Sequence, residues 1–213
     1  MGQIPRKDGK YLPKAANMWK MKYMCDLEQG AIQYASTCPT SSSEPSSRPG
    51  IGENLKTFPA TRFTFDTAPK KSVTEWWKVI RDVNYFENVV VFRPFHDGAP
   101  ISSFTQMGWA ATNELGCSIV KCTANNVYVG VCRYRPSGNI VNNNVYQVGN
   151  PCSMNPGGAS SYLHWCYTDT PKLLTMINRM EVTRKEKNPP NFLLDGFVTF
   201  VTRVIIMDQA YGQ

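Results

Sequence analysis

The spacing of apolar residues predicts a first helix that leads into a polar loop. Apolar side chains recur at i, i+4, i+7 and i+8, a pattern typical of one buried helix face, in Leu27, Ala31, Tyr34 and Ala35. The helix should end near Cys38, because residues 39–50 are rich in Ser and Pro. The motif "IGENL" follows at 51–55, and we expect an irregular stretch from there to Lys71.

Two further helices are predicted to begin with capping boxes. In the first, Ser72 and Glu75 precede an apolar stripe of Val73, Trp76, Trp77 and Ile80. In the second, Ser103 and Gln106 form the box, and the helical stripe consists of Phe104, Met107, Gly108, Ala111 and Leu115. Gly116 is placed to end this helix in the left-handed conformation.

Beyond Cys117 the apolar period changes to two, which predicts strands over 118–122 and 127–135. The turn signal Asn125-Asn126 joins them as a hairpin. Both faces of the second strand are apolar, as in a central strand that is covered on both sides. Helices before and around a short sheet indicate an α/β sandwich of three layers.

Composition narrows the function classes. The 213 residues suit one domain, with 42% hydrophobic and 18% charged residues. The net charge of +7 is scattered along the chain, so we interpret it as a solvated surface and expect no nucleic-acid partner. No apolar run reaches the about 18 uncharged residues of a membrane span, so none is expected.

The seven cysteines form no CxxC pair, which disfavours a zinc ribbon. Several stand beside aromatic and β-branched residues, as disulfide partners do in extracellular domains. We therefore expect a secreted, extracellular protein, although residues 1–5 are no secretory signal because no apolar run follows them. One explanation is a start codon placed too far downstream.

Four motifs, in the order of the family, resemble the CAP superfamily: "GENL" at 52–55, "FTQMGWAATNELGCSIVKC" at 104–122, "VCRYRPSGN" at 131–139 and "YQVGNPCS" at 146–153. The segment 12–38 is most similar to the nematode branch of venom-allergen-like, activation-associated secreted proteins. The resemblance implies an α-β-α sandwich (the CAP, or SCP, fold) over 1–150 that lacks its first helix. A short Cys-containing hinge over 151–166 and an unmatched tail over 167–213 would follow.

The resemblance also implies two disulfides, Cys38–Cys122 and Cys117–Cys132. Cys25, Cys152 and Cys166 have no assigned partner, and an odd total leaves at least one cysteine over. A free thiol or a shortened hinge is one interpretation, and an intermolecular bridge is the other.

Many members of the family hold zinc in a central cavity with two histidines and two acidic residues. The resemblance places Glu53 at the first glutamate, Val79 at the second glutamate and Ser103 at the second histidine. It places the first histidine on a helix upstream of the matched region. One of the four residues remains, so we expect no metal, no cofactor and no catalytic residue.

The remaining candidates have ordinary structural interpretations. The Ser103 hydroxyl should cap its helix, since a serine nucleophile needs a base to activate it. The two histidines are His96, which we interpret as a solvated loop residue, and His164 in the unmatched tail. Glu53 should accept backbone amides and hold a turn. Gly108 replaces the family's usual β-branched residue, which removes packing volume.

The tail over 167–213 contains a helical pattern at 171–187 and an apolar, β-like run at 196–206. It is either a poorly ordered extension or the source of an extra strand that adds to an exposed sheet edge.

The resemblance implies a secreted, non-enzymatic protein of a parasitic nematode that binds a host protein or a lipid at the host interface. The alternatives are a zinc-dependent or serine hydrolase, which the depleted cavity disfavours, and a sterol or fatty-acid carrier. A truncated product without a stable fold is the third alternative. The sequence leaves the oligomeric state open.

Overall fold

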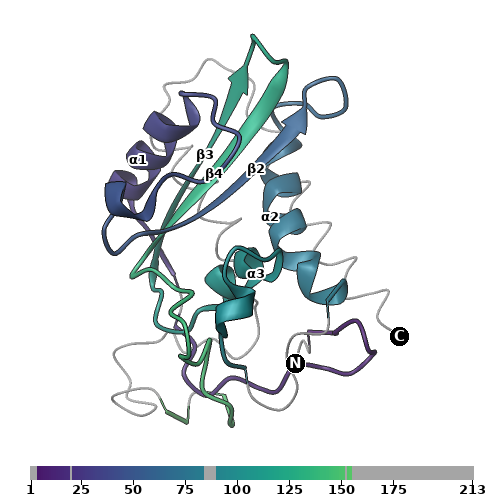
Figure 1. Cartoon of the computed structure of the whole chain (residues 1–213), viewed down its shortest axis with the longest axis vertical. Helices are drawn as coiled ribbons and strands as arrows, with labels where there is room; N and C mark the ends of the chain where they lie inside the picture. Colours follow the sequence, from purple (N-terminus) through teal and green to yellow (C-terminus); the bar gives the residue numbers. More distant parts are fainter. Residues whose placement is uncertain (1–3, 20, 84–89, 152, 155–213) are drawn as a thin grey trace, which may run out of the picture.

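The fold is a mixed four-stranded sheet with helices on both faces (Figure 1). The computed structural model of the chain describes residues 4–19, 21–83, 90–151, 153 and 154. Its strands are β1 (Lys22–Tyr23), β2 (Gly52–Pro59), β3 (Glu114–Cys122) and β4 (Val127–Arg135). Its α-helices are α1 (Cys25–Ala35), α2 (Ala68–Lys78) and α3 (Ile101–Gly108), and its 3₁₀ turns are η1 (Pro45–Ser47), η2 (Val79–Arg81) and η3 (Pro94–His96).

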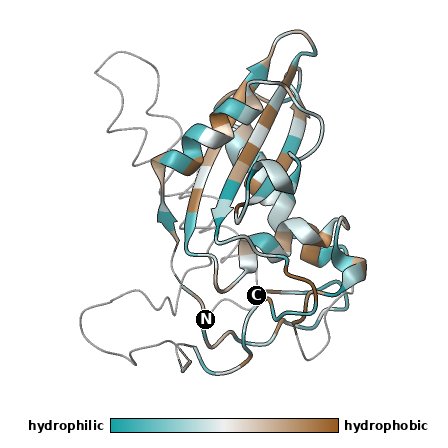
Figure 2. Cartoon of the chain, turned by 60° about the vertical axis from the view of Figure 1, so that its left-hand side comes forward, coloured by the Kyte–Doolittle hydropathy of each residue, from teal (hydrophilic) through white to brown (hydrophobic). Residues whose placement is uncertain are grey.

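Strand β4 lies inside the sheet, whose order is β1-β3-β4-β2. It is antiparallel to both neighbours, and β1 joins the far edge parallel to β3. On one face, Val129 and Val131 pack against Ala31 and Ala35 of α1. On the other face lies a cluster of buried residues from the sheet, α2 and α3, comprising Met21, Val73, Trp76, Met107, Leu115, Cys117, Cys132 and Tyr134. The predicted three-layer α-β-α sandwich is confirmed. Hydrophobic and hydrophilic residues alternate along the strands and α1 (Figure 2).

Helix α1 lies directly against the backbone of β3. The helix has the predicted apolar face, with Leu27, Ala31 and Ala35 buried. A Cβ atom at Gly116 would lie 2.2 Å from the backbone nitrogen of Glu28 and 2.6 Å from the carbonyl carbon of Leu27. The prediction that Gly116 ends a helix is therefore wrong: the residue is in β3, and its missing side chain permits this close helix–strand contact.

Helix α2 begins at Ala68, four residues before the predicted capping box. Pro69 stands in the first turn, where its missing N–H has no cost. Ser72 is inside the helix, where its hydroxyl donates to the carbonyl of Ala68 at 3.0 Å. Glu75 pairs instead with Lys71 and Lys78. Ser72 is buried against Gly130 of β4, so it packs the helix onto the sheet and does not cap it.

Helix α3 is shorter than predicted. It begins at Ile101, after Pro100, whose φ of −52° is already helical. It ends at Gly108, and Leu115, which the helical stripe included, lies in β3. Residues 109–113 leave the helix because the backbone then joins the sheet, where the amide of Asn113 donates to the carbonyl of Arg135.

Strand β2 was not predicted, and the expected irregular stretch up to Lys71 is wrong, because β2 extends to Pro59 and α2 begins at Ala68. It pairs with β4 over its whole length, from Gly52 opposite Tyr134 to Pro59 opposite Val127. Its sequence "GENLKTFP" contains glycine, asparagine, lysine and proline, which disfavour strands, so local propensity gives little signal. The pairing with β4 overrides that propensity and places Glu53 in a strand.

Both disulfides that the resemblance implies are formed. Cys38–Cys122 ties the segment after α1 to the end of β3, with a Cα–Cα distance of 5.8 Å. Cys117–Cys132 joins directly opposed residues of β3 and β4. Cys25 is a free, exposed thiol, whereas Cys152, Cys166, His164 and the tail over 167–213 lie outside the described residues. Within the part of the chain that is described, no helix combines the length and apolar content that a bilayer crossing requires.

Candidate functional site

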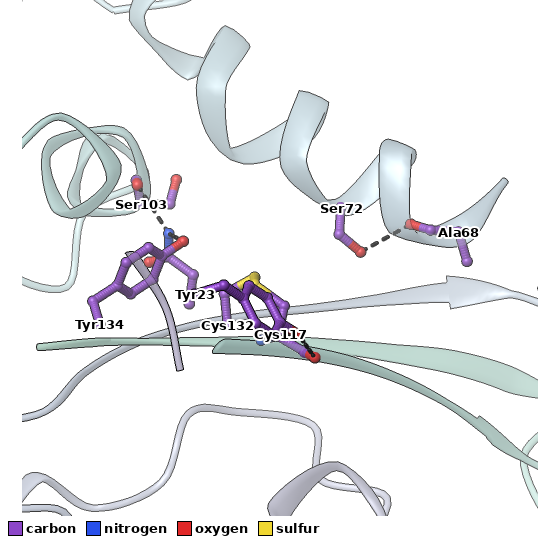
Figure 3. Close-up of a disulfide and its surroundings, with 8 residues drawn as sticks. Tyr23, Ala68, Ser72, Ser103, Cys117, Cys132 and Tyr134 are labelled. Atoms are coloured by element: carbon purple, nitrogen blue, oxygen red, sulfur yellow. Dashed lines mark hydrogen bonds between the residues drawn. A yellow bond between two sulfur atoms is a disulfide. The ribbon is translucent and has the colours of Figure 1, made fainter. Parts of the chain in front are cut away.

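Ser103 lies on α3, above the sheet face that carries Tyr134 (Figure 3). Its hydroxyl reaches two carbonyl oxygens, those of Pro100 at 3.0 Å and Trp76 at 3.3 Å. Asn54 of β2 donates to the carbonyl of Ser103 at 3.0 Å and to the Tyr134 hydroxyl at 3.3 Å. The prediction that Ser103 caps the helix start is wrong, because the residue is already inside the helix and its hydroxyl acts as a donor that links α3 to α2.

The groups around Ser103 offer no base in the described part of the structure. The recorded partners of its hydroxyl are carbonyls, which cannot take a proton from it. Burial raises the pKa of the Tyr134 phenol well above its usual range, although the hydrogen bond from Asn54 acts in the opposite direction. The phenol therefore stays neutral. Ser103 is thus held as a structural hydrogen-bond donor.

Val79 begins η2, directly after α2, and is half-buried. It packs against a buried apolar cluster that includes Phe92, Ile101 and Phe104. Trp77 stacks in a tilted arrangement on Phe104, with ring centroids 4.9 Å apart. This side of the site presents aliphatic and aromatic carbon, which gives a metal ion nothing to bind.

Glu53 lies on the opposite face of the sheet from Ser103. Neighbouring strand residues alternate between faces, and Asn54 contacts Ser103. Glu53 is paired across β2 and β4 with Arg133, which in turn is opposite Gly116 of β3, where α1 makes its close contact. The structure therefore brings Ser103 and Val79 to the α2–α3 side of the sheet and leaves Glu53 on the α1 side.

The Glu53 carboxylate is enclosed and fully engaged. Its side chain is 0% exposed, and Oε2 accepts from Nε of Arg133 at 3.0 Å. Oε1 accepts from the backbone amide of Ser43 at 2.7 Å and from the Ser43 hydroxyl at 3.0 Å. Arg48 adds a second cation, with its Nε 3.9 Å from Oε1. Glu53 thus accepts a backbone amide, as predicted, but it does so from a strand and holds the loop over 39–50.

These positions do not fit a zinc ion. Zinc sites need three or four nitrogen, sulfur or oxygen ligands that converge on one point. Here the carboxylate of Glu53 is taken by guanidinium and amide donors, Val79 has no ligand atom, and Ser103 faces the other side of the sheet. Among the described residues, no group of three or more His, Cys, Asp or Glu side chains is arranged to hold a metal.

His96 is buried, which makes the prediction of a solvated loop histidine wrong. It ends η3, is 1% exposed and lies between the rings of Phe92 and Phe95. Its Nδ1 accepts the backbone amide of Arg93 at 2.8 Å. Burial, and to a lesser degree the charge of Arg93, lowers the pKa of His96 below its ordinary value of 6.5. The imidazole is therefore neutral and part of the loop's structure.

We expect stability to depend on His96 at mildly acidic pH. Because the pKa is lower in the folded chain than in the unfolded chain, the unfolded chain binds the proton first as the pH falls through 6.5. The free energy of unfolding should therefore decrease from pH 7.5 down to the folded-state pKa. Urea unfolding at several pH values would measure this. His96→Asn, whose carbonyl can accept the same amide, should flatten this part of the profile, and an unchanged slope in that variant would contradict the assignment.

A protein-family model matches the part of the chain that contains these elements. The model of the cysteine-rich secretory protein family, CAP, matches residues 6–134. The Ancylostoma secreted protein of Ancylostoma caninum is 35% identical over 164 residues, which are 75% of this chain and 38% of the relative. The human cysteine-rich secretory protein LCCL domain-containing 1 is 30% identical over 172 residues, which cover 74% of this chain and 33% of the relative. The chain therefore spans less than half the length of these relatives.

Solved structures agree with the family match. The crystal structure of NaASP2 with Zn²⁺ superposes with a TM-score of 0.66 and 30% identity, covering 71% of this chain and 78% of that one. The crystal structure of Na-ASP-1 gives a TM-score of 0.67 and 33% identity, covering 76% of this chain and 41% of that one. With the matched residues, the sandwich and both disulfides in agreement, the chain belongs to the cysteine-rich secretory protein (CAP) family.

Proposed function

We propose that this CAP-domain protein is secreted and acts without catalysis, by binding a host protein or a lipid at the host interface. The observation that carries the proposal is the state of Glu53. The carboxylate that the resemblance assigns to the family's cavity is fully enclosed, accepts hydrogen bonds from Arg133 and Ser43, and lies on the opposite face from Ser103. A carboxylate in this state is a structural ion-pair partner.

Two features support secretion. The two disulfides are stable in an oxidising environment, such as that outside the cell. The Ancylostoma relative is named as a secreted protein, and the family as a whole is named for secretion. Because the match covers only part of that relative, secretion of the present protein remains part of the proposal.

The hydrolase alternative requires an activated nucleophile or a metal-bound water. The Ser103 hydroxyl donates hydrogen bonds to backbone carbonyls, and Val79 offers only an aliphatic side chain. Neither group supplies the required chemistry. The binding function therefore agrees better with the site than hydrolysis does.

A zinc titration tests the non-catalytic part of the proposal. We expect the oxidised protein to show no saturable, stoichiometric zinc binding at micromolar concentration by calorimetry. Glu53→Gln should leave the trace unchanged, as should the control Glu44→Gln, which changes an exposed carboxylate in the same loop. One equivalent of zinc that is lost only in Glu53→Gln would overturn the proposal. A second measurement, mass spectrometry of lipids extracted from the protein, distinguishes a lipid ligand from a protein ligand.

A further inference from the structure

The cluster around Glu53 contains more positive than negative charge. Two guanidinium groups, those of Arg48 and Arg133, share the single carboxylate of Glu53. Their side chains are only 11% and 15% exposed, so solvent screens the surplus weakly. Burial lowers the pKa of Arg48. The negative charge of Glu53 raises this pKa, and the positive charge of Arg133 lowers it. Glu44, the other carboxylate that acts on Arg48, is exposed to solvent.

The two arginines differ in what their nitrogens do. All three nitrogens of Arg48 are used inside the protein: Nε donates to the Ser43 hydroxyl at 3.0 Å, Nη2 donates to the Ser43 carbonyl at 3.1 Å and Nη1 donates to the Ile51 carbonyl. Arg133 uses only Nε, which donates to Glu53. Within the described residues, its Nη1 and Nη2 make no hydrogen bond, and neither is among the fully enclosed side-chain atoms that lack a partner. Both nitrogens therefore reach solvent.

The guanidinium of Arg133 is held in place by α1. Its carbon lies 5.9 Å from the centroid of the Tyr34 ring, which is within cation–π range. A Cβ atom at Gly30 would lie 2.5 Å from Nη1, so the guanidinium occupies the space that a side chain at position 30 would fill. The Tyr34 hydroxyl is fixed in turn by donating to the carbonyl of Ser41 at 2.8 Å. Helix α1, the 39–50 loop and Glu53 thus hold the planar guanidinium of Arg133 in one orientation, with Nη1 and Nη2 on the side that reaches solvent.

We propose that Nη1 and Nη2 of Arg133 bind an oxyanion, such as a carboxylate, phosphate or sulfate group, beside Tyr34 on the α1 side of the sheet. A guanidinium fork presents two parallel N–H groups that match two oxygens of such a group. The bound anion would also neutralise the surplus positive charge of the cluster. The site goes beyond the function proposed above: Glu53 orients Arg133, but the oxyanion itself would contact Arg133 and neither Ser103 nor Val79.

The test is a titration of the oxidised 213-residue protein with sodium sulfate, sodium phosphate or sodium acetate, at constant ionic strength balanced with sodium chloride. Chemical shifts of the arginine Nε–H groups report binding at the site. We expect saturable binding in the millimolar range for at least one oxyanion. A response to acetate alone identifies a carboxylate site, whereas a response to sulfate or phosphate identifies a tetrahedral oxyanion.

Two variants distinguish the contribution of the planar guanidinium to anion binding from the contribution of its positive charge. Arg133→Lys keeps the charge and removes the fork, and it should weaken binding about tenfold, which corresponds to one lost charge-assisted hydrogen bond. Gly30→Ala keeps Arg133 but displaces Nη1, and it should weaken binding as much. Arg62→Lys, at an exposed arginine after β2, is the control and should bind like the parent protein. A cooperative thermal unfolding transition is required of each variant, and Gly30→Ala serves alone if Arg133→Lys does not fold.

Either of two results would overturn the site. The first is the absence of saturation with all three oxyanions. The second is equal affinity in the parent, Arg133→Lys and Gly30→Ala proteins, which would mean an adventitious ion only. A zinc titration reports on ligand groups and not on this fork, so failure here leaves the proposed non-catalytic function untouched.

Discussion

Replacing Cys38 and Cys122 together by alanine should lower the free energy of unfolding by about 4–5 kcal/mol, the largest effect that we expect from one cross-link. The bridge closes a loop of sequence separation 84, and restriction of the unfolded chain grows with loop length. It also joins the end of the first helical segment to the far end of β3, so its loss leaves the 39–50 loop without a covalent anchor. Urea unfolding of the oxidised variant measures the change.

The second bridge is the matched control. Cys117–Cys132 spans a separation of only 15, so the Cys117→Ala, Cys132→Ala protein should lose about 3 kcal/mol. Cys122, Cys117 and Cys132 are buried and Cys38 is partly buried, so the loss of buried side-chain volume is no larger for the long-loop pair. A larger loss for the short loop than for the long loop would show that native-state packing, and not the restriction of the unfolded chain, dominates.

Gly116→Ala should destabilise the protein by about 3 kcal/mol or more, at the upper end of overpacking effects. The new methyl group would lie 2.2 Å from the backbone nitrogen of Glu28 and 2.8 Å from Cβ of Leu27. Backbone atoms cannot move aside as a flexible side chain can, so α1 would have to lift away from β3. Thermal unfolding measures the loss, and the same variant should weaken hydrogen-exchange protection in α1 more than in α2.

Gly108→Ala is the control for this substitution. Gly108 is the last residue of α3, and a Cβ atom there would meet only Cγ1 of Val145, at 3.9 Å. Alanine should therefore stabilise the protein by about 0.5–1 kcal/mol, because glycine loses more conformational freedom on folding. Destabilisation of equal size by Gly108→Ala and Gly116→Ala would mean that steric contact with α1 is not the cause.

The sequence predicted the elements whose pattern and packing agree. Helix α1 was predicted from its apolar face, and β4 was predicted with its observed ends because both of its faces are buried. The helical stripe through Leu115 was misleading. Apolar residues at helical spacing continue past Gly108, but Leu115 is buried in β3 and Met107 in α3. The helical spacing of apolar residues indicates which residues are buried, but here the buried residues belong to two elements, α3 and β3.

The capping boxes failed for a related reason. Serine followed three residues later by Glu or Gln marks a helix start only when the preceding residues are not helical. Proline at 69 and at 100 favours an earlier start, since its fixed φ suits the first turn. Ser72 and Ser103 therefore lie inside their helices, where Ser72 donates to the carbonyl of Ala68 and Ser103 donates to the carbonyl of Pro100, the residue just before α3.

The arrangement of Glu53, Val79 and Ser103, which the resemblance assigned to one cavity, could not be predicted from the order of the motifs. The side chains of a strand alternate, so the face that Glu53 occupies depends on the register of β2 against β4. The sequence did contain one sign of the cluster that was missed. Arg133 interrupts the apolar α1 face of a buried central strand, and a charge in that position requires a partner of opposite sign. Glu53 is that partner.

The bridge between Cys38 and Cys122 makes a closed ring of the chain that contains β2, α2, α3 and all of β3, whose last residue is Cys122. A single proteolytic cut anywhere inside that ring leaves two polypeptides that are still one covalent molecule. Release of a fragment therefore requires reduction of the bridge or a second cut, so a nicked molecule keeps both of its parts together where proteases are abundant and reductants are scarce.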